Sequence, residues 1–140
     1  MDVTEIMEML PHRYPMLLVD RVLECDDKER IVAIKNLTAT EAYFQGHFPG
    51  DPVMPGVYQL EAMAQVAGIL MNKTSGREGA IAYFLAVDNA RFRKVLRPGD
   101  QLRIEVNMLR SRMNMCRVHG VITVDGDVAC EADLLFGRKA

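Results

Sequence analysis

The chain has 140 residues, of which 49% are hydrophobic and 26% are charged, and its formal net charge at pH 7 is −2. This composition is typical of a globular protein with enough apolar material for a core, so disulfides or a structural metal are not needed. The slight negative charge excludes binding to nucleic acid through overall basicity. We therefore expect one domain over residues 1–140 and no nucleic-acid partner.

The start of the chain lacks the features of a signal peptide, because MDVTEIMEMLPHR is acidic and has no positive segment or long apolar run. No stretch reaches roughly 18 uninterrupted apolar residues, so no membrane span is predicted. The three cysteines are widely spaced and form no CxxC pair, which is typical of reduced, buried thiols. Together these features predict a cytoplasmic protein.

The first third of the chain predicts a short helix and two strands. Asp2 can cap the helix, with Glu5 as the second half of a capping box, and Pro11 ends it. Apolar runs and alternation predict strands over 16–23 and 30–37. Both faces of the second strand are partly apolar, which favours a sheet that wraps around another part of the fold. Residues 40–44 are then expected to form a short turn or helical piece.

A long helix is predicted to begin near Pro55, where proline suits the first turn, and to continue to about residue 71. Apolar residues occupy nearly all sides of this segment, which is typical of a buried helix. Asp125-Gly126 is a strong signal for a two-residue hairpin turn. Further strands are expected over 80–87 with a continuation through 90–95, over 102–109, over 115–124 and over 128–136.

These elements predict the α+β class, with one buried central helix and about five or six strands, mostly antiparallel. A single sheet wrapped around one helix covers that helix on one side only. Since the predicted helix is apolar nearly all round, another element must cover the rest. A second copy of the chain is the simplest cover, so we infer a homodimer.

One histidine and one acid stand out between residues 45 and 71. His47 lies in a loop rich in proline and glycine, and Glu61 is the only charged residue between Asp51 and Lys73. A buried carboxylate is costly unless it is paired or has a task. Histidine suits a general base near neutral pH, and burial favours the protonated form of a carboxyl group. Such a pair suits removal of a proton with loss of a hydroxyl group.

The predicted start of the long helix supplies a third element. The backbone N–H groups of Gly56 and Val57 have no acceptor inside the helix and carry the positive end of its dipole. A carbonyl oxygen bound there would be polarised, and an enolate beside it would be stabilised. The absence of a side chain on Gly56 also lets a substrate approach the backbone closely.

The alternative for each residue is a structural role. Taken alone, His47 fits a loop or packing histidine, and Glu61 fits a satisfied core carboxylate. His12, beside Pro11, is not predicted to be catalytic, and a metal site at His119 would lack further ligands. We expect no metal and no cofactor, since no GxGxxG, P-loop, GxSxG or HExxH motif is present.

Basic residues cluster around the predicted strand over 90–95 with the turn that follows it, and at the C-terminus. Two interpretations remain open: a solvated strand and turn, or a docking surface for an acidic partner or a phosphate. The cluster consists of Arg91, Arg93, Lys94, Arg97, Arg138 and Lys139.

Four runs distributed over almost the whole chain resemble the (3R)-hydroxyacyl-acyl carrier protein dehydratases of type II fatty-acid synthesis. They are LPHRYPMLLVDRV (10–22), GHFPGDPVMPGVYQLEAMAQ (46–65), ARFRKVLRPGDQL (90–102) and CEADL (130–134). The resemblance implies a hotdog fold, in which a curved antiparallel sheet wraps around a long central helix. It also implies a catalytic dimer, commonly assembled as a trimer of dimers.

The resemblance further implies that His47 and Glu61 are the catalytic pair, contributed by opposite subunits, which the residues alone do not decide. Gly56 matches the position whose N–H polarises the thioester carbonyl, and Tyr83 matches an aromatic position at the mouth of the acyl tunnel. The basic cluster becomes a docking site for acyl carrier protein. A sister group that also isomerises carries Asp at the position of Glu61, so this chain fits the dehydratase-only group.

One departure from the family is Tyr58-Gln59, where many relatives are aliphatic, and it bears on acyl-chain preference. Two rival functions remain. A hotdog thioesterase would release free thiol, and a silent acyl-binding dimer would bind the carrier protein without turnover. The combination of His47 and Glu61 argues against the silent dimer.

Overall fold

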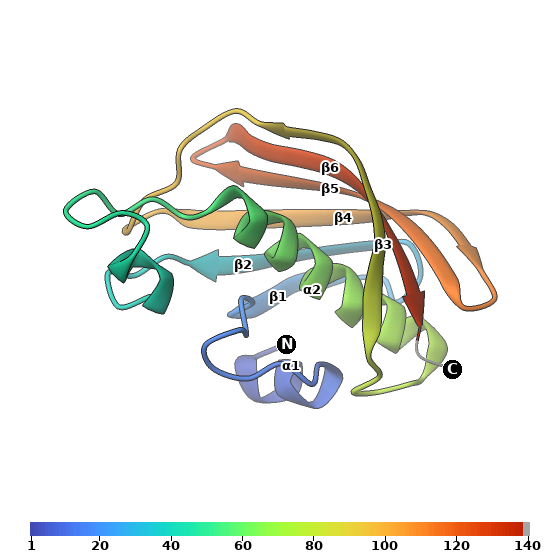
Figure 1. The fold of residues 1–140 in the computed structure, drawn as a ribbon. Helices are drawn as coiled ribbons and strands as arrows, with labels where there is room; N and C mark the ends of the chain where they lie inside the picture. The colour runs from blue at the N-terminus through green and yellow to red at the C-terminus, as the bar shows by residue number, and fades with distance from the viewer. Residues whose placement is uncertain (139–140) are drawn as a thin grey trace.

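The computed structural model describes residues 1–138, which form one six-stranded antiparallel sheet and a long helix (Figure 1). The strand order is β1-β2-β4-β5-β6-β3. The elements are α1 (Val3–Met9), β1 (Arg21–Cys25), β2 (Arg30–Asn36), the 3-10 helix η1 (Ala42–Gln45), α2 (Gly56–Ser75), β3 (Ala82–Phe92), β4 (Gln101–Arg112), β5 (Met115–Val124) and β6 (Asp127–Arg138).

The sheet curves around α2, which contacts β2, β4, β5 and β6 (Figure 1). The helix and the concave face of the sheet form one apolar core, in which Met63, Val66 and Leu70 of α2 are fully buried together with Ile104 and Ile122. The predicted class, with a curved antiparallel sheet around a central helix, is therefore confirmed. Within residues 1–138, no helix has the length and apolarity needed to cross a membrane.

Local signals placed several boundaries correctly. Asp2 and Glu5 form the predicted capping box at α1, since each side chain accepts from the other's backbone N–H. Asp125 and Gly126 both have positive φ, 51° and 83°, as a type I′ hairpin turn between β5 and β6 requires.

The predicted end of the long helix is wrong by about one turn. The helix continues to Ser75 and ends at Gly76, which adopts the left-handed conformation with φ 68°. The hydroxyl groups of Thr74 and Ser75 donate to the carbonyls of Leu70 and Met71, one turn earlier in the helix. These polar side chains therefore bond to the helix backbone, and the helix continues through them.

The first predicted strand is also wrong over residues 16–20, and β1 begins only at Arg21. The side-chain amide of Gln65 bonds to the backbone here, accepting from Leu18 N at 2.8 Å and donating to Met16 O at 2.6 Å. A side chain of α2 therefore supplies the hydrogen-bond partners of these backbone groups, which a neighbouring strand would supply in a sheet. By contrast, the two pieces predicted over 80–87 and 90–95 form a single strand, β3, with a register shift between Asp88 and Arg91.

The three cysteines have no disulfide partner among residues 1–138. Cys116 and Cys130 are buried, as predicted, whereas Cys25 is half-buried. Burial raises the pKa of the Cys130 thiol to about 12, which keeps it protonated at neutral pH.

Close packing between α2 and β5 depends on Gly120. A Cβ atom at this position would overlap Cγ and Sδ of Met63, which is fully buried. We expect Gly120→Ala to lower the free energy of unfolding by roughly 1–3 kcal/mol, because overpacking forces the helix or Met63 to shift. Urea unfolding of both proteins measures this change. Gly46→Ala is a matched control, since a Cβ there meets nothing within 4 Å; an equal loss in both variants would contradict the prediction.

Candidate active site

His47 follows η1 and lies in a loop whose hydrogen bonds fix its ring. Its Nδ1 is 2.8 Å from the carbonyl oxygen of Val53, and the backbone N–H of Val53 donates to the carbonyl of His47 at 2.9 Å. The ring also stacks on Phe48, with ring centroids 3.9 Å apart. Because a carbonyl only accepts, Nδ1 carries the proton in the neutral ring and Nε2 keeps its lone pair. This is the arrangement that a general base needs.

The start of α2 lies in the same cavity, which His47, Val53, Gly56 and Gln59 line together with residues 92–95. Pro55 precedes the helix and no side chain caps it. The ring of Phe92 lies so close to Gly56 that a Cβ would be 2.9 Å from its Cε1. Val57 is 68% exposed. The structure thus brings the predicted base and the uncapped helix start together.

Gln59 is a polar residue that lines this cavity. From the sequence it was identified only as a departure from the family. It is 3% exposed, and its Oε1 has no hydrogen-bond partner in the part of the chain that the structure describes. An unpaired buried acceptor costs about 1–3 kcal/mol, so it is uncommon outside functional sites.

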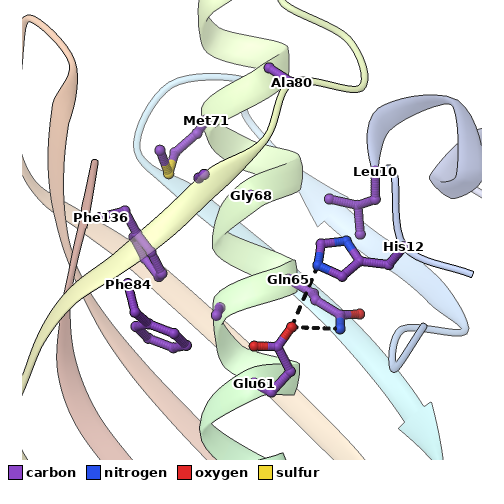
Figure 2. Close-up of a pocket in the computed structure, with 11 residues that line it drawn as sticks. Leu10, His12, Glu61, Gln65, Gly68, Met71, Ala80, Phe84 and Phe136 are labelled. Atoms are coloured by element: carbon purple, nitrogen blue, oxygen red, sulfur yellow. Dashed lines mark hydrogen bonds and ion pairs between the residues drawn. The ribbon is translucent and has the colours of Figure 1, made fainter. Parts of the chain in front are cut away.

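Glu61 lies in a second cavity, which Gln65, Gly68 and Met71 of α2 also line (Figure 2). Its Oε1 accepts from Nε2 of Gln65 at 3.0 Å and lies 3.5 Å from Nε2 of His12. The side chain is 22% exposed. The other walls of the cavity are apolar and include Phe84 of β3 and Phe136 of β6, whose rings lie close together.

Within one chain, His47 and Glu61 therefore line different cavities. Helix α2 presents Gly56 and Gln59 to the first cavity and Glu61 and Gln65 to the second. Each cavity contains half of the predicted acid–base pair.

Tyr83 lies on β3, opposite Gly137 of β6, and is 53% exposed. It is the neighbour of Phe84, which lines the cavity of Glu61. Tyr83 itself lines neither the cavity of Glu61 nor that of His47.

The basic cluster divides into two places. Arg93 and Lys94 line the cavity of His47, and each is paired, with Glu131 at 3.0 Å and Asp127 at 3.8 Å. Arg138 lies at the opposite end of the β3–β6 ladder.

Each remaining member of the cluster has its own surroundings. Arg97 pairs with Asp51, and Arg91 donates to its neighbour's carbonyl. The Arg138 guanidinium donates to the carbonyl of Met71. Lys139 lies outside the described residues.

The third histidine belongs to neither cavity. Nδ1 of His119 is 2.7 Å from Oδ1 of Asp133, and this hydrogen bond, with one from Asn89, lowers the pKa of the Asp133 carboxyl. Over residues 1–138, no group of three potential metal-ligating side chains is found.

The curved sheet around one central helix defines a hotdog-fold protein, with acid–base residues and a helix start at its candidate site. A family model described as the FabA-like domain matches residues 10–133, and the chain belongs to this family.

Curated relatives cover nearly the whole chain. The 3-hydroxyacyl-[acyl-carrier-protein] dehydratase FabZ of Bacillus cereus (strain AH820) is 49% identical over 136 residues, which span 97% of this chain and 94% of that protein. The enzyme of the same name from Shewanella oneidensis is 50% identical over 143 residues, spanning 99% and 93%. The family resemblance predicted from the sequence is confirmed.

Solved structures support the fold. The dehydratase heterocomplex ApeI:P from Xenorhabdus doucetiae matches with a TM-score of 0.83 and 21% identity, over 96% of this chain and 91% of that chain. Cj0977 from Campylobacter jejuni matches with a TM-score of 0.70 and 19% identity, over 97% and 88%. The hotdog fold implied by the resemblance is therefore confirmed.

Proposed function

We propose that the chain dehydrates (3R)-hydroxyacyl-acyl carrier protein to the trans-2-enoyl thioester, with His47 as base and Glu61 as acid. The activity rests on one observation, the 49% identity over 97% of the chain to a 3-hydroxyacyl-[acyl-carrier-protein] dehydratase. The similarity extends over nearly the full length of both chains, which supports the same reaction here. Because the reaction removes water from the substrate, the enzyme is a hydro-lyase, and it acts in fatty-acid synthesis.

The reaction proceeds from the two half-sites. Nε2 of His47 removes the proton on the carbon next to the thioester, while the N–H of Gly56 stabilises the negative charge on the thioester oxygen. Glu61 then donates its proton to the 3-hydroxyl group, the carbon–oxygen bond breaks, and water leaves as the double bond forms. Acid–base groups of this kind typically contribute about 10²- to 10⁴-fold each, and one such N–H about 10²- to 10³-fold. No step requires a metal or redox cofactor.

A second subunit is needed to join the half-sites. Within residues 1–138, strand β3 is an edge strand whose one partner is β6. It exposes a row of large apolar side chains: Tyr83, Phe84, Leu85, Val87 and Phe92. Such an edge is normally covered, and a second copy covers it symmetrically. Phe84 lines the cavity of Glu61 and Phe92 lines that of His47, so a dimer along β3 reaches both.

We therefore assign each active site to His47 of one subunit and Glu61 of the other. Tyr83, an exposed residue of β3, is assigned to the mouth of the acyl tunnel on the family resemblance. Assembly of three dimers into a hexamer follows from the resemblance alone. Arg93 and Lys94 border the candidate base, so they are the members of the basic cluster best placed to receive an acidic carrier protein.

The activity itself can be tested with purified protein and a 3-hydroxyacyl thioester of acyl carrier protein. We expect the ultraviolet absorbance of a conjugated enoyl thioester to rise while free thiol stays constant. Release of thiol would instead indicate a thioesterase, and binding without either change would indicate a silent acyl-binding dimer. Product analysis should give the trans-2-enoyl isomer alone, since Glu61 fits the dehydratase-only group.

A further inference from the structure

Oε1 of Glu61 faces two donors, and Oε2 has no hydrogen-bond or ion-pair partner among residues 1–138. One donor is Nε2 of Gln65, one helical turn further along α2, and the other is Nε2 of His12 (Figure 2). The sequence predicted no catalytic role for His12. We infer that His12 is a positioning residue, which holds Glu61 so that Oε2 carries the proton that is transferred. This inference rests on the proposed role of Glu61 as the acid.

Gln65 is the rigid member of the arrangement. It is 1% exposed, and its amide bonds to Leu18 N, Met16 O and the carboxyl of Glu61. All of these contacts suit a single orientation of the amide, with its oxygen toward Leu18 and its nitrogen toward Glu61. Backbone atoms of Met16 and Leu18 therefore fix the orientation of the amide that donates to Oε1.

His12 is held by its own segment, between α1 and β1. The guanidinium of Arg13 donates to the carbonyls of Met7, Leu10 and His12 at 2.7–3.0 Å, which fixes the backbone around the ring. Nδ1 of His12 is buried without a hydrogen-bond partner in the described part of the chain.

The unpartnered Nδ1 decides which nitrogen carries the proton. In a neutral imidazole one nitrogen carries the proton, and an N–H at the buried Nδ1 would be left without an acceptor, which is costlier than burying a lone pair. The favoured tautomer therefore has its proton on Nε2, which lies 3.5 Å from Oε1 of Glu61.

Two donors on one oxygen constrain the acid. A protonated carboxyl group has one carbonyl oxygen and one hydroxyl oxygen, and donors favour the carbonyl oxygen. Oε1 then accepts from Gln65 and faces Nε2 of His12 at 3.5 Å, while the proton is on Oε2. After the proton leaves, the same two donors stabilise the carboxylate without rearrangement. Among residues 1–138, His12 and Glu61 are the titratable residues that line this cavity. Apart from Gln65 the other lining residues are apolar, which strengthens these interactions.

The test compares His12→Leu with His12→Gln. We expect His12→Leu to lower kcat by about 10- to 100-fold, as removal of a residue that orients a catalytic group commonly does, with KM changed little. His12→Gln should recover most of the rate, because the glutamine amide places an N–H near the position of the imidazole Nε2. His119→Leu is the matched control, since that histidine also faces a carboxylate but lines neither cavity, and it should keep the wild-type rate.

A double-mutant cycle separates positioning from a general structural role. In a Glu61→Gln background, His12→Leu should cost little further rate, because the group it positions is already absent. An equal loss in both backgrounds, a wild-type rate for His12→Leu, or equal losses for the Leu and Gln variants would overturn the inference. If Glu61→Gln itself keeps the wild-type rate, the proposed function of Glu61 fails as well, which distinguishes the two failures.

Discussion

Replacement of His47 by alanine, or of Glu61 by glutamine, is expected to lower kcat/KM by about 10²- to 10⁴-fold. His47→Ala removes the base whose ring is oriented by Val53. Glu61→Gln keeps the size of the side chain but removes the proton that the leaving hydroxyl needs. Hydration of a crotonyl thioester, the reverse reaction, measures both losses with a simple substrate.

The controls for these variants address folding. His47 is a loop residue and Glu61 is partly exposed, so neither change creates a large core cavity. The urea midpoint of each variant should therefore differ from that of the wild type by no more than an ordinary surface substitution causes. A folded variant that hydrates crotonyl thioester near the wild-type rate would show that its residue is not catalytic.

Mixing the two inactive variants is expected to restore activity. In a dimer of one His47→Ala subunit and one Glu61→Gln subunit, one site carries both defects and the other carries none. Random mixing makes half of the dimers mixed, so activity should recover to roughly a quarter of the wild-type value. This recovery is large because either variant alone is expected to lose at least about 10²-fold.

The same experiment decides between cross-chain and same-chain sites. If both residues of a site came from one chain, every site in the mixture would carry one defect and no activity would return. Co-expression of the two variants with different tags, followed by two-step purification, isolates the mixed dimer. A mixture of His47→Ala with wild-type subunits shows whether exchange itself changes the rate.

Much of the candidate site was predictable because it lies in one stretch of sequence. His47, Gly56 and Glu61 stand out by type and setting, and the structure confirms the helix start and the loop that hold them. The contacts of Gln59, Gln65 and His12 were not predictable. Each of these side chains has an ordinary local setting, and its role depends on atoms brought close by folding.

The error over residues 16–20 has the same origin. The apolar run there fits a strand by local pattern, yet the backbone bonds to Gln65, which lies 47 and 49 positions from Leu18 and Met16. A periodicity within a short window contains no information about such a partner. The segment that the strand prediction misplaced is the one that holds the donor for Glu61.

By itself, the sequence determined the α+β class, the central helix, the hairpins and the family, because helical and strand periods and turn residues act over a few neighbouring positions. Only the tertiary structure decided that α2 divides His47 and Glu61 between two cavities, that β3 is the exposed apolar edge, and that His12 faces Glu61. These features depend on strand order and on contacts between distant segments, which a curved sheet closing around a helix creates.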